Sequence, residues 1–137
     1  MDVNSITERT IGAAIEVHKH LSAGLLESAY ETCLCRELDL RDIRYRRQVE
    51  LPIIYKGTKL DCGYRIDMIV EEAVVVEIKS VKAIDPIHEA QLITYLRLGG
   101  WKVGLIINFN VTMLKDGIKR KVLNFDESIS ASSAPRR

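Results

Sequence analysis

Two nearly continuous apolar runs constrain the fold of this chain more than any other feature. Val103 to Phe109 reads VGLIINF, and Ala73 to Val81 reads AVVVEIKSV. A strand with one face in water alternates apolar and polar residues, whereas a run with few polar residues is typical of a strand that is covered on both faces. The two runs therefore predict buried strands of an α/β sheet that is flanked by helices.

Three other segments have the residue spacing of amphipathic helices. The first begins at a capping-box pattern formed by Ser5 and Glu8 and ends before Gly24. The second runs from about Leu25 to Leu40. The third, Asp85 to Leu98, opens with an Asp-Pro pair that suits an N-cap and a first helical position.

Three strands are expected between the second and third helices. Tyr45 to Tyr55 alternates apolar and polar residues, and Pro52 favours an edge position. After a turn at Lys56 to Thr58, Leu60 to Val70 and Ala73 to Val81 read as an antiparallel hairpin. With the apolar run after the third helix, the expected order is ααβββαβ, with about four strands in the sheet.

Length and composition fit one domain. The chain has 137 residues, of which 47% are hydrophobic, and this leaves no room for a second core. We expect a single α/β (α+β) domain over residues 1–125 and a frayed, Ser- and Ala-rich tail over residues 126–137. Cys33, Cys35 and Cys62 match no four-ligand zinc spacing and are expected to be free, buried thiols.

The formal net charge of +1 neither requires nor excludes a polyanionic partner. The sequence has no apolar run of about 18 residues, and its N-terminus lacks the basic and then apolar pattern of a secretory signal. We therefore expect a cytoplasmic protein with no membrane association.

The predicted hairpin brings charged residues together. Side chains alternate along a strand, so Glu77 and Lys79 lie on one face. If the connection is a three-residue loop, Val70 pairs with Val74 and Asp67 falls opposite Glu77. A slip of one residue would turn Asp67 to the other face of the sheet.

Two adjacent carboxylates repel each other unless a cation lies between them. Mg²⁺ commonly takes one or two protein carboxylates and keeps water and phosphate oxygens as its other ligands. Lys79 could then orient a metal-bound water. The alternative is an ordinary cross-strand charge network on a solvated face, but the apolar neighbours of Glu77 favour a functional site.

Several separated motifs point in the same direction. Gly24 to Tyr30 reads GLLESAY, and it is followed in order by YRIDMIV, VVVEIKSV, HEAQLITYLRL and VGLIINFN. From about Ile11 to Arg120 the chain resembles the GxxExxY proteins, a RecB-like branch of the PD-(D/E)XK nuclease superfamily. The resemblance implies a restriction-endonuclease-like core and a requirement for Mg²⁺ or Mn²⁺.

The resemblance also implies roles for individual residues. Asp67, Glu77, the Ile78 main-chain carbonyl and Glu27 would be metal ligands, and Lys79 would be the catalytic lysine. For Glu27 the alternative is an ordinary solvated glutamate on a helix.

Gln91 and Tyr95 match the Q-x-x-x-Y helix of the RecB-like enzymes, in which the glutamine supports the active site. The alternative is a half-buried polar stripe on the third helix, to which His88 also belongs. The residues expected to contact substrate are Tyr30, Tyr95, His88, Arg46 and Arg47. The two arginines belong to a basic cluster whose alternative is solvated surface charge.

The expected function is hydrolysis of phosphodiester bonds in DNA or RNA, with DNA favoured, leaving a 5′-phosphate and a 3′-hydroxyl. One alternative is a nucleic-acid-binding or protein-interaction module that keeps the fold without turnover. Another is a scaffold whose charged strand face is an interface. Because so small a chain has little surface with which to enclose a duplex, formation of a homodimer is a further alternative.

Overall fold

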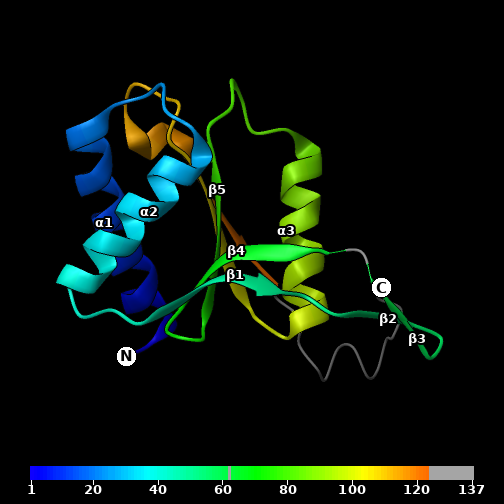
Figure 1. The fold of residues 1–137 in the computed structure, drawn as a ribbon. Coiled ribbons are helices and arrows are strands. Elements are labelled where there is room, and N and C mark those ends of the chain that lie inside the picture. Colours follow the sequence, from blue (N-terminus) through cyan, green and yellow to red (C-terminus); the bar gives the residue numbers. More distant parts are fainter. Residues whose placement is uncertain (62, 124–137) are drawn as a thin grey trace.

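A five-stranded mixed sheet separates two layers of helices in the computed structural model, which describes residues 1–61 and 63–123 (Figure 1). The strand order is β1-β4-β5-β6-β7, with β5 and β6 parallel and the other pairs antiparallel. The elements are α1 (Val3–Leu21), α2 (Glu27–Leu40), β1 (Tyr45–Glu50), β2 (Ile53–Tyr55), β3 (Thr58–Leu60), β4 (Arg65–Val70), β5 (Val74–Lys79), α3 (Pro86–Gly99), β6 (Val103–Asn108), the 3-10 helix η1 (Leu114–Gly117) and β7 (Ile118–Val122).

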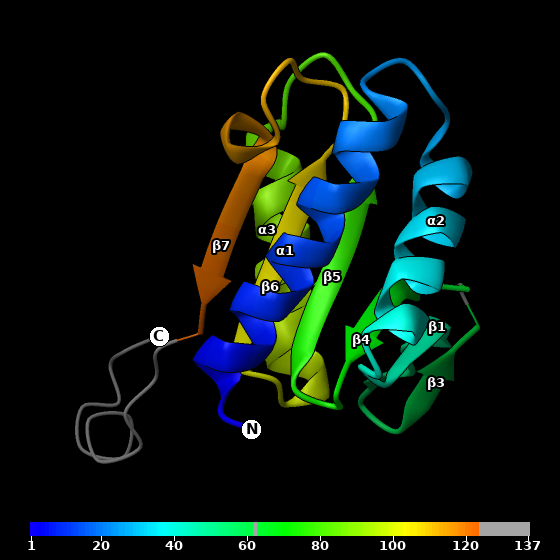
Figure 2. The same ribbon diagram turned by 90° about the vertical axis from the view of Figure 1, so that its left-hand side faces the viewer.

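The sheet has a hydrophobic core on each face. Helices α1 and α2 cover one face and α3 covers the other, as Figures 1 and 2 show. Within β5, Val74, Val76 and Ile78 join the core under α1 and α2, whereas Val75 joins the core under α3. Each such aliphatic side chain contributes roughly 1.5–3 kcal/mol when it is fully buried. The predicted α/β class and the burial of both apolar runs are confirmed.

Two expected strands are shorter than the sequence suggested. The expected strand Tyr45 to Tyr55 is interrupted at residues 51–52, where Pro52 has no N–H to donate to a ladder. The expected strand Leu60 to Val70 is split into β3 and β4. Lys56 and Gly57 both have positive φ, at 50° and 86°, which suits a tight two-residue hairpin turn. As a result β2 and β3 form a small sheet of their own.

The prediction of about four strands missed β7, the edge strand that pairs with β6. Its sequence, IKRKV, reads as a solvated basic segment because its charged side chains project from both faces. Arg120 donates to Asn4 Oδ1 in α1 at 2.8 Å, and Lys121 forms an ion pair with Glu89 in α3. These contacts fasten the strand to both helical layers.

The structure corrects the predicted cap of α1 and confirms the predicted start of α3. The start of α1 is capped by Asp2, whose carboxylate accepts from Ser5 N at 2.8 Å, so the expected box between Ser5 and Glu8 is wrong. The start of α3 at Pro86 is confirmed, and Asp85 N donates to His88 Nδ1 at 3.1 Å. One nitrogen of His88 is therefore committed to the helix cap.

Other expectations concern the thiols, the membrane and the tail. Cys35 is buried and Cys33 is half-buried, and both are free, while Cys62 lies outside the described residues. Among the described residues, no helix has the length and hydropathy that crossing a membrane would require. The tail expected over residues 126–137 also lies outside the described residues.

Tyr30 is an internal residue. It has no exposed surface, and its ring stacks on Phe109 with centroids 4.4 Å apart and planes at 7°. Its hydroxyl donates to Ser22 O and accepts from Leu25 N at 3.1 Å, which fastens the loop between α1 and α2. These contacts correct the expectation that Tyr30 contacts substrate, because no part of its ring is accessible.

Replacing Tyr30 with Phe should keep the ring stacking and leave two backbone groups without their partner. We predict a loss of about 1–2 kcal/mol in the free energy of unfolding, measured by urea denaturation. Tyr55→Phe is the matched control, because Tyr55 is exposed and its variant should be as stable as the wild type. Equal stability of Tyr30→Phe and the wild type would contradict this role.

Candidate active site

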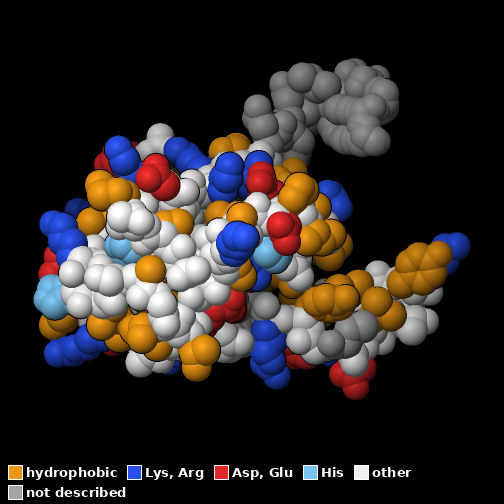
Figure 3. Space-filling view, turned by 90° about the horizontal axis from the view of Figure 1, so that it is seen from above, with side chains coloured by type: hydrophobic (Ala, Val, Ile, Leu, Met, Phe, Trp, Pro, Cys, Tyr) orange, Lys and Arg blue, Asp and Glu red, His pale blue; other side chains and the backbone are white. Residues whose placement is uncertain are grey.

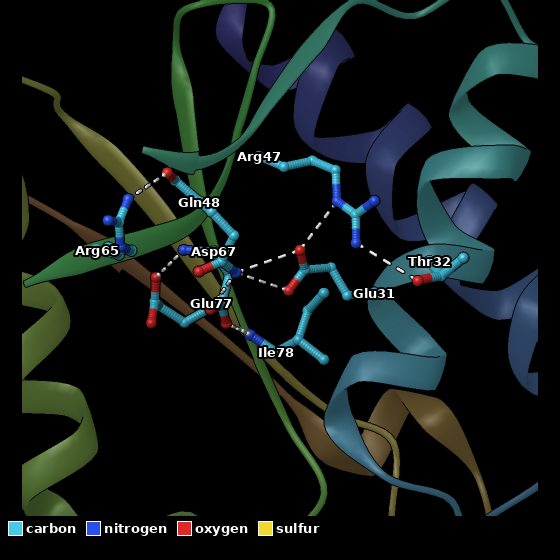
Figure 4. Close-up of polar contacts among 8 residues, drawn as sticks. All are labelled: Glu31, Thr32, Arg47, Gln48, Arg65, Asp67, Glu77 and Ile78. Atoms are coloured by element: carbon cyan, nitrogen blue, oxygen red, sulfur yellow. Dashed lines mark hydrogen bonds and ion pairs between the residues drawn. The ribbon is translucent and has the colours of Figure 1, made fainter. Parts of the chain in front are cut away.

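The hairpin of β4 and β5 has the register that the sequence predicted, with Val70 paired to Val74. Regular pairing continues to Met68 and Val76 and then gives way to side-chain contacts (Figure 4). Asp67 N donates to Glu77 Oε2 at 3.0 Å, and Ile78 N donates to Asp67 Oδ2 at 2.8 Å. Each carboxylate therefore takes the place of a backbone acceptor where the two strands separate.

This exchange also orients the Ile78 carbonyl. The N–H and C=O of one strand residue point to the same edge of the strand. Because Ile78 N donates to Asp67, the Ile78 carbonyl is directed to the edge that faces β4. Lys79 O points to the opposite edge, where it accepts from Phe109 N at 3.0 Å.

A third strand contributes Gln48, which the sequence analysis did not single out. Its φ of 47° lies in the left-handed region, and the regular pairing of β1 with β4 passes over Gln48 and Asp67. Its amide donates to Glu31 Oε1 at 3.0 Å and to Asp67 Oδ1 at 3.4 Å (Figure 4). A strained backbone at such a position is typical of a functional site.

Glu31 is the helical carboxylate beside this cluster, and the sequence analysis missed it as well. It is only 7% exposed, and Arg47 Nε donates to its Oε2 at 3.0 Å. A signal was present in the sequence: Leu34, Cys35 and Leu38 follow Glu31 at helical spacings of three, four and seven. Glu31 is thus a charged residue within the buried face of α2.

Burial and mutual repulsion govern the charge of the two strand carboxylates. Burial raises the pKa of Asp67, although the hydrogen bond from Ile78 N opposes the shift. Burial and the negative charge of Asp67 raise the pKa of Glu77 to about 8. The ammonium of Lys79 acts in the opposite direction and favours the ionised form of both carboxyl groups. The charge states of Asp67, Glu77 and Lys79 are therefore coupled.

Glu27 lies at the first position of α2 and contacts the end of β5. Ser80 N donates to Glu27 Oε2 at 3.3 Å, and Ser80 Oγ donates to Leu25 O at 2.6 Å. These bonds attach the start of α2 to the residue that follows Lys79. The structure thus places Glu27 beside the strand end and places Glu31, one turn later, beside Asp67.

Helix α3 lines the other side of the site. Tyr95 is buried, and its pKa is raised by burial and then by the negative charge of Glu77, so its hydroxyl lies within electrostatic reach of that carboxylate. Gln91, one turn earlier, is half-buried. His88 has its Nδ1 engaged in the helix cap and lies one further turn towards the start of α3.

The arginines expected to contact substrate are paired with carboxylates. Arg46 forms two hydrogen bonds with Glu72, of 2.7 and 2.9 Å, next to the turn of the β4–β5 hairpin. Arg47 points towards α2, where it contacts Glu31 and Thr32. These bonds use Nε and Nη2 of each guanidinium and partly neutralise its charge.

The donor set is small for a metal ion. Within residues 1–61 and 63–123, no group of three or more His, Cys, Asp and Glu side chains is arranged to hold one. The half-buried Asp67 and the buried Glu77, both with raised pKa values, and a main-chain carbonyl on the same strand edge suit Mg²⁺ or Mn²⁺, since Mg²⁺ retains several water or phosphate ligands. The residues present therefore fit such an ion.

The raised pKa of Glu77 predicts how the metal-free protein responds to pH. The folded state holds a proton on Glu77 that the unfolded state releases near pH 4.5, so stability should fall between pH 4.5 and about 8. The expected loss is on the order of a few kcal/mol, and Glu77→Gln should remove most of it. Urea denaturation in EDTA at a series of pH values measures the effect.

Glu72→Gln is the matched control for this pH dependence. Glu72 is exposed, and its pKa is lowered by Arg46, so it stays ionised throughout the interval. This variant should follow the wild-type curve. Parallel curves for the wild type and Glu77→Gln would show that Glu77 does not carry the effect.

Comparison with known proteins identifies the family. A family model described as the PD-(D/E)XK nuclease superfamily matches residues 4–121. No curated protein and no solved structure matches the chain. The matched segment contains the carboxylates of β4 and β5, the lysine that follows them, and all three helices from residue 4 onward. The chain belongs to the PD-(D/E)XK nuclease superfamily.

Proposed function

We propose that the protein is a Mg²⁺- or Mn²⁺-dependent nuclease that hydrolyses phosphodiester bonds, with DNA favoured over RNA. The observation that carries the proposal is the pairing of Asp67 and Glu77 through reciprocal bonds to the β4 and β5 backbones, with the charge of Lys79 acting on both. Such a cluster is unfavourable without a cation and favourable with one.

Asp67 and Glu77 would hold the ion, together with the Ile78 carbonyl that points to the same edge. The ion, when bound, lowers the pKa of a bound water and offsets the charge of a phosphate. Lys79 supplies a second positive charge that stabilises negative charge as it builds up on the phosphate. Products would carry a 5′-phosphate and a 3′-hydroxyl.

Residues of β1, α2 and α3 would act around this centre. Gln48 and Glu31 fix the orientation of Asp67, because the Gln48 amide bonds both carboxylates. Glu27 holds the end of β5 through Ser80 and so positions Lys79. Gln91 and Tyr95 on α3 would face the substrate phosphate. These assignments extend the resemblance to the RecB-like GxxExxY proteins.

Nuclease activity is tested with labelled single-stranded and duplex DNA and with RNA in Mn²⁺. Asp67→Asn keeps an oxygen that can accept from Ile78 N and removes the charge, so cleavage should fall at least about 100-fold. Lys79→Ala should cause a similar loss, whereas Glu72→Gln should cleave like the wild type. Cleavage that survives both site variants would refute the assignment.

Metal binding is tested separately by calorimetric titration with Mn²⁺ at pH 8. The wild type should bind Mn²⁺. Glu77→Gln should bind it at least about ten-fold more weakly, because only one carboxylate of the pair remains. At pH 5.5 the protonated Glu77 should weaken binding by the wild type. If the wild type bound DNA and no Mn²⁺, the alternative of an inactive nucleic-acid-binding module would replace this proposal.

A further inference from the structure

The hairpin β2–β3, which we call the arm (residues 53–60), projects from the body of the protein (Figure 1). Its strands pair with each other and not with the main sheet. Ile54 is 68% exposed and Tyr55 is 62% exposed. An isolated two-stranded hairpin is only marginally stable in water, and exposed apolar residues that gather on one element mark a binding surface.

The arm combines an aromatic and apolar face with positive charge. Pairing of Ile53 with Leu60 and of Tyr55 with Thr58 places these four side chains on one face. Lys56 lies at the turn, with Nζ 5.4 Å from the centre of the Tyr55 ring, and Lys59 lies on the other face. The arm contains no Asp or Glu. Its charge therefore complements a polyanion.

The arm is continuous with the candidate active site. Tyr64 and Arg65 lie on the path from the arm into β4, and Tyr64 is 43% exposed. Burial raises the pKa of Tyr95, and the charges of Glu77 and Tyr64 raise it further, so both groups lie near Tyr95. Viewed from above, acidic side chains lie in a hollow of the body, and the hydrophobic side chains of the arm extend away beside it (Figure 3). Tyrosines thus occur in α3, in the segment that precedes β4 and in the arm itself.

We propose that the arm binds the single-stranded part of a nucleic-acid substrate, a refinement that rests on the proposed nuclease function. Bases would stack on Tyr64 and Tyr55, and the phosphates would lie near Lys56, Lys59 and Arg65. Only an unpaired base exposes a ring face to a tyrosine, so a duplex would need a frayed or single-stranded end. Strands of three residues span about 10 Å, which corresponds to roughly two or three stacked nucleotides.

A second copy of the chain is the other occupant to consider. Two arms docked against each other would bring four lysines together without a single arm carboxylate to compensate them. Like charges at such a contact cost free energy, whereas a phosphate backbone is attracted to them. The charge of the arm therefore favours nucleic acid.

The test is fluorescence anisotropy in EDTA with a labelled single strand of about 12 nucleotides and a blunt duplex of the same sequence. Without a divalent ion the proposed cleavage cannot occur, so binding is measured independently of activity. The wild type should bind the single strand more tightly than the blunt duplex. Tyr55→Ala should weaken single-strand binding about ten-fold, and Tyr55→Phe should stay within about two-fold of the wild type.

Charge is tested in the same assay. Replacing both Lys56 and Lys59 with Ala should lower the slope of log K against log salt by about 1.4, or roughly 0.7 for each lost phosphate contact. Leu40→Ala is the matched control for Tyr55→Ala, because Leu40, at the end of α2, is 61% exposed and Tyr55 is 62% exposed. This control variant should bind the single strand like the wild type. Unchanged thermal midpoints confirm that the variants are folded.

Three results would overturn the proposal. The first is a Tyr55→Ala variant that binds as tightly as the wild type, and the second is a wild type that does not prefer the single strand. The third is a Tyr55→Ala variant that changes the oligomeric state in light scattering and not DNA binding, which would assign the arm to a dimer. None of these results would refute the proposed nuclease function, which the cleavage assay tests separately.

Discussion

The structure depends on the way Asp67 and Glu77 replace backbone acceptors where β4 leaves β5. The buried Glu77 and the half-buried Asp67 each accept a backbone N–H, at 3.0 and 2.8 Å, that the separating strands no longer satisfy. An unpaired buried N–H or carboxylate would be costly, so the two needs offset each other. The remaining cost is the burial of the Glu77 carboxylate and its repulsion by Asp67, which together raise the pKa of Glu77.

The rest of the fold holds this junction in place. The two hydrophobic cores fix β5 between α2 and α3, so that Glu31 approaches from one helical layer and Tyr95 from the other. Gln48 has a positive φ where the regular ladder is interrupted, and its side chain bridges Glu31 and Asp67. The arm begins beyond the same strand β1. Site and arm are therefore positioned by the same irregular edge of the sheet.

The sequence predicted those features that follow from local pattern. The apolar runs gave β5 and β6, the Asp-Pro pair gave the start of α3, and a three-residue loop gave the pairing of Val70 with Val74. Features that depend on contacts between distant elements were missed. Gln48 and Glu31 join the site through the docking of α2 on β1, and β7 is recognisable only through its pairing with β6. Tyr30 was misassigned because its motif position does not reveal that its ring is buried and stacks on Phe109.

The protonation of Glu77 tests the central claim most directly. Carbon-13 NMR of the labelled side-chain carboxyl group, followed from pH 4 to 9 in the metal-free protein, should show titration near pH 8, and added Mg²⁺ should move that titration to lower pH. Titration of Glu77 near its ordinary value of 4.5, unchanged by Mg²⁺, would contradict a carboxylate pair that requires a cation.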